Sequence, residues 1–97
     1  MNSKGNEVKD MTDTIKDSVR GFVVENFLFG DAAQAPADAE SLIENGIMDS
    51  TGVLELVAFI EERFGIAMAD SDIVPANLDT LDRIAAFVAA RTASAAA

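Results

Sequence analysis

The sequence predicts an all-α protein of one domain, with three longer helices and one short one. Its 97 residues are enough for one domain and too few for two. Hydrophobic residues make up 49% of the chain, which suffices for one small core and argues against disorder. Apolar residues recur at helical spacing in three segments, and strict alternation never extends beyond three or four residues. We therefore expect helices and no sheet.

The first helix is predicted over residues 12–29. Residues 1–11 are polar and lack periodicity, so we expect a mobile tail before it. Thr12 can cap the start of the helix, and Gly30 follows its last turn, where a glycine commonly ends a helix. The stripe that would face the core consists of Ile15, Val19, Phe22, Val23 and Phe27, with Asn26 as its polar member.

A long connection follows, over residues 30–49. Its first part contains Pro36, which breaks a helix, and offers little to bury. Leu42, Ile43, Ile47 and Met48 can pin its second half to the core. Loops of this length in a small domain are more often functional than not.

The second helix is predicted to begin at Ser50, with Asp49 as its N-cap, and to end at Gly65. The apolar stripe of this helix consists of Val53, Leu56, Val57, Ile60 and Phe64. Another sector, turned away from the core, carries Leu54, Glu55, Ala58, Glu61 and Glu62. Ser50 projects near the edge between these two sectors.

The remaining elements are a short turn and a last helix. Residues 70–74, before Pro75, can form a single helical turn at most. The last helix begins near Thr80, capped by Thr80 or Asp79, and should fray after Arg91 into a flexible, alanine-rich tail, residues 92–97. This places the domain at residues 12–91. The stripe of the last helix consists of Leu81, Ile84, Ala85, Val88 and Ala89, flanked by Phe87.

Composition excludes several functional classes. The chain has no Cys and no His, which removes disulfides, thiolate chemistry, triads built on His and the commonest metal ligands. The net charge of −10 opposes nucleic acids and anionic membranes, and no apolar run approaches the roughly 20 residues of a membrane helix. The polar residues 1–5 contain no secretory apolar segment, so we expect a cytoplasmic protein. We expect neither catalytic residues nor a metal site.

One segment has a recognisable pattern: residues 42–50 read Leu-Ile-Glu-Asn-Gly-Ile-Met-Asp-Ser. This resembles the attachment site of acyl carrier proteins and peptidyl carrier domains, in which a Leu, a Gly and two apolar residues precede Asp-Ser at the start of a helix. Residues 53–66 and 70–81 agree with the same family, so the resemblance extends over about residues 12–91. It implies a small four-helix bundle of acyl-carrier type, with a long loop between its first two helices.

The resemblance also implies a prosthetic group. In this family a phosphopantetheinyl transferase joins 4′-phosphopantetheine to the serine, which here is Ser50, flanked by Asp49. The residues make chemical sense of this assignment, because a chain without a thiol must import the sulfur on which it would hold a thioester. A helix N-terminus also favours the negative charge of a phosphodiester.

The resemblance further implies partner enzymes that load, transfer or extend the acyl or aminoacyl group. In the family, acids on the second helix dock to basic patches on such enzymes, and the matching positions are Glu55, Glu61 and Glu62, with Leu54 and Ala58 beside them. Eleven acids and only two arginines, Arg63 and Arg83, lie between residues 38 and 83, which fits such docking and fits a solvated surface as well. We expect a monomer that binds neither nucleic acid nor membrane.

Two positions depart from the fatty-acid carriers, which have Leu directly after the modified serine. Here Thr51 and Gly52 follow Ser50, and glycine in a helix costs up to about 1 kcal/mol relative to alanine. The departure favours a stand-alone carrier of a specialised lipid or natural-product pathway over one of housekeeping fatty-acid synthesis.

Two alternatives stay open. A non-catalytic, acidic interaction module would share the helices and the charge, and in that case Ser50 would only start a helix. A calcium site is suggested by Asp70-Ser71-Asp72, but Pro75 and Leu81 occupy the places of the required Gly and Glu.

Overall fold

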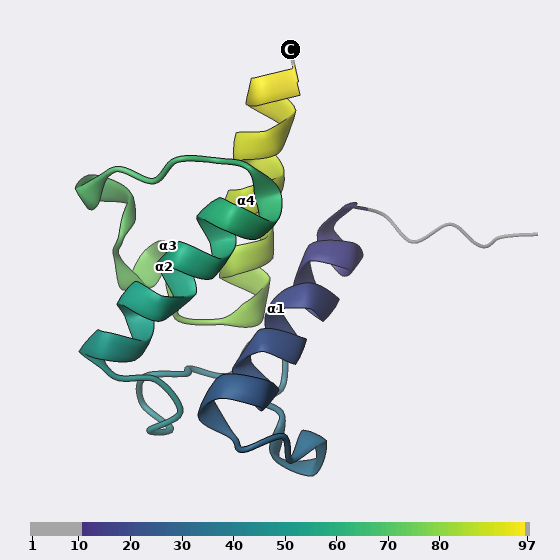
Figure 1. Ribbon diagram of the computed structural model, residues 1–97, viewed down its shortest axis with the longest axis vertical. Coiled ribbons are helices and arrows are strands. Elements are labelled where there is room, and N and C mark those ends of the chain that lie inside the picture. The colour runs from purple at the N-terminus through teal and green to yellow at the C-terminus, as the bar shows by residue number, and fades with distance from the viewer. Residues whose placement is uncertain (1–10, 97) are drawn as a thin grey trace, which may run out of the picture.

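The computed structural model describes residues 11–96, and all regular elements in this range are helical (Figure 1). Four α-helices, α1 (Met11–Phe27), α2 (Ser50–Phe64), α3 (Pro75–Leu78) and α4 (Leu81–Ala96), are joined by loops that contain two 3₁₀ turns, η1 (Ala32–Gln34) and η2 (Asp70–Asp72). The all-α prediction, with three longer helices and a short one, is confirmed. The predicted tail at residues 1–11 lies outside the described residues, except for Met11.

The helix boundaries differ from the prediction at four places. Helix α1 already includes Met11, so Thr12 lies within the helix instead of capping it. Helix α1 ends at Phe27 instead of Phe29, because Phe29 and Gly30 both adopt left-handed backbone angles, with φ of 56° and 80°. Helix α4 does not end near Arg91 but continues to Ala96, which agrees with the high helix propensity of alanine. The short helix α3 follows Val74 and begins at Pro75, which occupies the first turn, where a missing N–H is not needed.

The core lies where the apolar stripes of the three long helices meet. Helix α1 packs chiefly against α4, α3 also packs against α4, and α2 closes the bundle against α1 and α4. The buried cluster consists of Ile15, Val19, Val23, Leu42, Met48, Leu56, Val57, Ile60, Leu78, Leu81, Ile84, Ala85 and Val88. Most stripe residues predicted from sequence are in this cluster, and Val53 and Phe64 are half-buried beside it.

The long loop between α1 and α2 is fastened at two points. Near its middle, the Asp38 carboxylate accepts from Lys16 and Arg20 of α1, and the Asp38 carbonyl accepts from the Asp82 N–H at 3.0 Å. Lys16 also pairs with the Asp82 carboxylate at 2.7 Å. The hydrogen bond from Lys16, together with that from Arg20, holds the pKa of Asp38 below 3.8, and Asp82 and Asp38 raise the pKa of Lys16 above 10.5.

The second fastening point is the junction between α3 and α4. The Asp79 carboxylate accepts from the Ser41 hydroxyl at 2.7 Å and from the Ile43 N–H at 3.0 Å, and the Asp79 carbonyl accepts from the Leu42 N–H at 2.8 Å. Thr80, not Asp79, caps α4, because its hydroxyl accepts from the Arg83 N–H at 3.0 Å. The loop thus reaches α2 from fixed points on the bundle.

Candidate functional site

Ser50 is the first residue of α2, and its side chain is exposed. Asp49 caps the helix as predicted: its carboxylate accepts from the Gly52 N–H at 2.8 Å and its carbonyl accepts from the Val53 N–H at 2.9 Å. Among the described residues, the N–H groups of Ser50 and Thr51 have no hydrogen-bond acceptor. These two donors and the helix dipole therefore face outward beside the serine hydroxyl.

A tight turn delivers the chain to Ser50. The Leu42 carbonyl accepts from both the Ile47 N–H, at 2.9 Å, and the Met48 N–H, at 3.2 Å. Gly46 lies inside this turn with φ of 71°, a conformation that glycine adopts without steric cost. Leu42 and Met48 are buried at either end of the turn, so they fix the direction in which α2 begins.

Gly52 lies buried in the first turn of α2. A Cβ at this position would lie 3.1 Å from Met48 Cγ and 3.2 Å from Phe27 Cζ. The Phe27 ring at the end of α1 therefore packs directly over the helix backbone. The glycine that departs from the fatty-acid pattern serves this close approach, a role that sequence analysis did not identify.

The five predicted docking residues of α2 are not equivalent. Leu54 is 63% exposed, and Glu55, Ala58 and Glu62 are exposed as well. Glu61 is half-buried, and its carboxylate accepts from the Met68 N–H at 2.8 Å. This hydrogen bond ties the segment after α2 back onto the helix, so Glu61 has an internal role that the other four lack.

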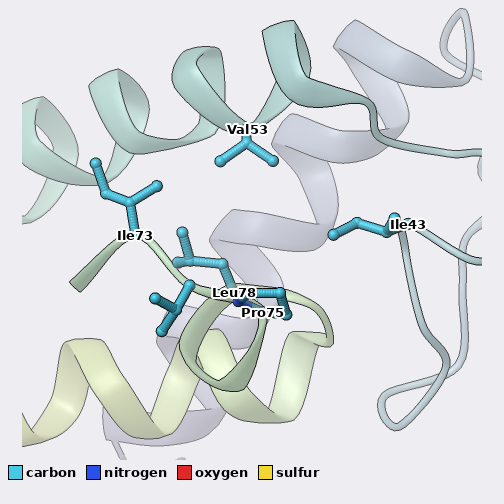
Figure 2. A pocket seen from close by; sticks show the side chains of 6 residues that line it. Ile43, Val53, Ile73, Pro75 and Leu78 are labelled. Atoms are coloured by element: carbon cyan, nitrogen blue, oxygen red, sulfur yellow. The ribbon is translucent and has the colours of Figure 1, made fainter. Parts of the chain in front are cut away.

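An apolar cavity of about 130 Å³ opens near the start of α2, between that helix, the long loop and α3. Figure 2 shows its lining, to which α2 contributes Val53, one turn after Ser50. The lining side chains are Ile43, Val53, Ile73, Val74, Pro75 and Leu78. Leu78 is buried in the core, whereas Ile43 and Val74 remain 43% and 38% exposed.

The sequence alone indicates no common role for the cavity residues. Ile43 is predicted to pin the loop to the core and instead lies at the cavity's edge, while Ile73 and Val74 are predicted only as part of a turn. The signal that could have found them is an apolar pair directly before Pro75, since apolar residues in an otherwise polar turn need a surface to cover.

Arg91 of α4 holds the outer wall of the cavity, which Ile73 and Val74 form. Its guanidinium donates to the Ala67 carbonyl and to the Asp72 carboxylate, both at 2.8 Å, and lies over the Phe87 ring. The hydrogen bond from Arg91, and then that from the Ala69 N–H, lower the pKa of Asp72 below 3.8. The Asp72 carboxylate suggested as a calcium ligand is thus engaged by Arg91.

A second cavity, of about 320 Å³, lies where the start of α1 meets the end of α2. It is lined by Met11, Thr14, Ile15, Arg63, Phe64 and Thr92, and α2 reaches it with the end opposite to Ser50. Within residues 11–96, no group of three or more acidic side chains could hold a metal ion. No helix in the same range is long and apolar enough to cross a membrane.

Comparison with known proteins identifies a relative. No model of a protein family matches the chain. A curated D-alanyl carrier protein from Abiotrophia defectiva is 35% identical over 54 residues, which cover 56% of this chain and 68% of that protein. Homology with a carrier protein implies a phosphopantetheine prosthetic group. The helical fold and this relative together show that the chain is a non-catalytic member of the acyl carrier protein family of phosphopantetheine carriers.

Proposed function

We propose that this protein carries an acyl or aminoacyl group on 4′-phosphopantetheine attached to Ser50. The observation that carries the proposal is the position of Ser50, exposed at the start of α2 in a segment with the pattern of carrier attachment sites. The 35% identity to a curated carrier protein supports the same assignment.

The surroundings of Ser50 fit a phosphodiester. The N–H groups of Ser50 and Thr51 have no acceptor among the described residues, and anions bind well at such helix starts. Asp49, the acidic residue directly before Ser50, accepts from the Gly52 N–H, so its carboxylate is held by the helix that it caps. Ser50, Thr51 and the first turn of α2 would therefore hold the phosphate of the group.

In the attachment step, the Ser50 hydroxyl oxygen attacks the pantetheine-bearing phosphorus of coenzyme A. The pyrophosphate bond breaks, adenosine 3′,5′-bisphosphate leaves, and the hydroxyl proton passes to a base of the transferase. When bound, the group supplies the thiol that this cysteine-free chain lacks, on which a thioester can be held. The chain itself contributes a rigid helix start and a surface for partner enzymes.

We propose a small load. The relative is named for a D-alanyl group, which is a short aminoacyl group. The apolar cavity beside α2 has about 130 Å³, less than an engineered cavity of about 150 Å³ that holds one benzene molecule. A long acyl chain would exceed this space, whereas a group as small as alanyl or a short acyl group would not.

The proposed partners are a phosphopantetheinyl transferase and loading or transfer enzymes with basic patches. Leu54, Glu55, Ala58 and Glu62 form an exposed surface on α2, which we call the α2 face. Its carboxylates can meet Arg or Lys of a partner, while Leu54 and Ala58 give apolar contact. Glu61 is not part of this face, because its carboxylate already accepts from the Met68 N–H.

The proposal is tested by intact-mass measurement after incubation with coenzyme A, Mg²⁺ and a broad-specificity phosphopantetheinyl transferase. We expect the parent to gain one phosphopantetheinyl group and Ser50→Ala to gain none. Ser71→Ala, which removes another exposed serine at a helical turn, is the matched control and should be modified like the parent.

A parent that gains no mass with several transferases would contradict the proposal. Ser50 would then be only the first residue of a helix, and the acidic interaction module would be the better interpretation. Equal modification of Ser50→Ala and the parent would place the attachment on another residue.

A further inference from the structure

Phe29, in the turn after α1, has two unfavourable features. Its side chain is 98% exposed, the highest value among the large apolar residues described. Its backbone is left-handed, with φ of 56°, and it is the only residue other than glycine in the described range with a positive φ. Glycine or asparagine is the usual residue at such a position, because a bulky side chain strains it. Folding therefore gives no reason for a phenylalanine here.

The turn lies at the end of the bundle that carries Ser50 (Figure 1). Phe27, two residues before Phe29, packs against Gly52, two residues after Ser50, with Phe27 Cζ 3.2 Å from the position of a Cβ. The turn is also held in place, because the Gly30 N–H donates to the Val24 carbonyl at 2.8 Å. Phe29 is therefore presented from a fixed turn near the start of α2.

Acidic residues precede and follow Phe29 in the chain. Glu25 and Asp31 lie on either side of Phe29 in the chain, both are exposed, and neither belongs to an ion pair among the described residues. The Asp31 carboxylate also accepts from the Ala33 N–H at 3.1 Å and from the Gln34 side chain at 2.8 Å, so Glu25 is the more available of the two. The Glu25 carboxylate approaches the turn, with Oε2 3.9 Å from the position of a Cβ on Gly30. The complement of this surface is an apolar pocket with Arg or Lys at its rim.

We propose that Phe29 is a docking contact for the phosphopantetheinyl transferase, inserted into an apolar pocket with a basic rim on that enzyme. The inference rests on the proposed modification of Ser50. Later partners reach the load through the flexible arm, whereas the transferase must bring its catalytic groups to the Ser50 hydroxyl itself. It is therefore the partner that must approach this end of the bundle most closely.

The test measures modification kinetics with the transferase of the same organism, using Phe29→Asn, Phe29→Gly and Phe29→Leu. Asn and Gly tolerate the left-handed backbone, so their melting temperatures should equal or exceed that of the parent. We expect both to raise KM about tenfold with kcat within about twofold, and Phe29→Leu to retain most of the apolar contact. Met11→Asn, which removes a 53% exposed apolar side chain at the other end of α1, is the matched control.

Because the contact is apolar, the rise in KM should persist at about 0.5 M salt, where charge contacts are screened. A parent that is modified, with Phe29→Asn and Phe29→Gly showing unchanged KM, overturns the inference and leaves the proposed function standing. A fall in melting temperature for both variants also overturns it, because Phe29 would then have a structural role. A parent that is not modified at all contradicts the proposed function, and this inference with it.

Discussion

At the residue scale, Gly52 shows how one missing side chain sets the position of the candidate site. It is buried where the first turn of α2 meets the Phe27 ring and Met48. Its N–H also donates the capping bond to Asp49. A glycine that weakens an isolated helix thus allows α1 and the start of α2 to approach closely, which orients Ser50.

We expect Gly52→Ala to destabilise the fold by about 1 kcal/mol. The new Cβ would lie 3.1 Å from Met48 Cγ and 3.2 Å from Phe27 Cζ, and overpacking of about 1–3 kcal/mol outweighs a gain in helix propensity of at most about 1 kcal/mol. Gly21→Ala is the matched control. Gly21 lies within α1 with no atom within 4 Å of the added Cβ, so this change should stabilise by about 0.5–1 kcal/mol.

Urea unfolding of both variants measures the two effects. If Gly52→Ala stabilises the protein as much as Gly21→Ala does, Phe27 does not pack closely enough on the α2 backbone to resist an added methyl group. The two glycines would then be equivalent, and Gly52 would have no special role in placing Ser50.

At the scale of elements, the segment between α2 and α3 depends on Arg91. The Arg91 guanidinium donates hydrogen bonds to the Ala67 carbonyl and to the Asp72 carboxylate. The same carboxylate accepts from the Ala69 N–H at 2.9 Å. Asp72 immediately precedes Ile73 and Val74, which line the cavity beside α2. One residue of α4 therefore holds the outer wall of that cavity against the bundle.

This arrangement predicts a loss of order in residues 66–74 at acid pH. Arg91, and then the Ala69 N–H, hold the folded-state pKa of Asp72 below the 3.8 of an unperturbed carboxyl. The resulting stabilisation is complete above the unfolded-state pKa and is lost as the pH falls through the lower folded-state pKa. Amide hydrogen exchange in this segment, corrected for intrinsic rates, should accelerate as the pH falls below about 4.

Asp72→Asn should already exchange faster at neutral pH and lose that acid dependence. Asp70→Asn is the control, because it removes a neighbouring charge from η2 without breaking an ion pair. Faster exchange in Asp70→Asn, or an unchanged acid profile in Asp72→Asn, would show that general charge and not the bond to Arg91 governs this wall.

At the scale of the whole molecule, acidic charge dominates. The net charge is −10. Lys16, Arg20 and Arg91 form ion pairs with Asp residues of the same chain. Such a field steers basic partners toward the protein and depends on salt. The proposed docking at the α2 face should therefore act more on the rate of encounter than on the proposed attachment at Ser50.

We expect Glu55→Lys to lower kcat/KM for transfer by a partner enzyme, by several-fold at low salt and less at physiological salt. Asp70→Lys is the matched control, since it changes the net charge equally but lies in η2, which follows the other end of α2. Equal losses in both variants would indicate that net charge alone steers the partner. Unchanged kinetics at low ionic strength would exclude Glu55 from docking.

Much of this protein could be predicted from local sequence, because its strongest signals act over short distances. Asp49 and Gly65, predicted as caps, occupy those positions at the two ends of α2, and Thr80 caps α4. The periodic stripes predicted the core of the three long helices, since a helix repeats about every 3.6 residues and must bury its apolar side. The Asp-Ser pattern and its flanking residues are enough to select Ser50 as the candidate attachment site.

Only tertiary structure decided the roles that join distant segments. From the sequence alone, Gly52 is a residue that weakens a helix, and Glu61 is a surface acid. In the structure, Phe27 packs on Gly52, and the Met68 N–H donates to the Glu61 carboxylate. Asp79, one of two predicted caps, instead fastens the long loop, while Ile73 and Val74 form a cavity wall held by Arg91. Capping and periodicity are local properties of the chain, whereas these contacts exist only once the helices have packed.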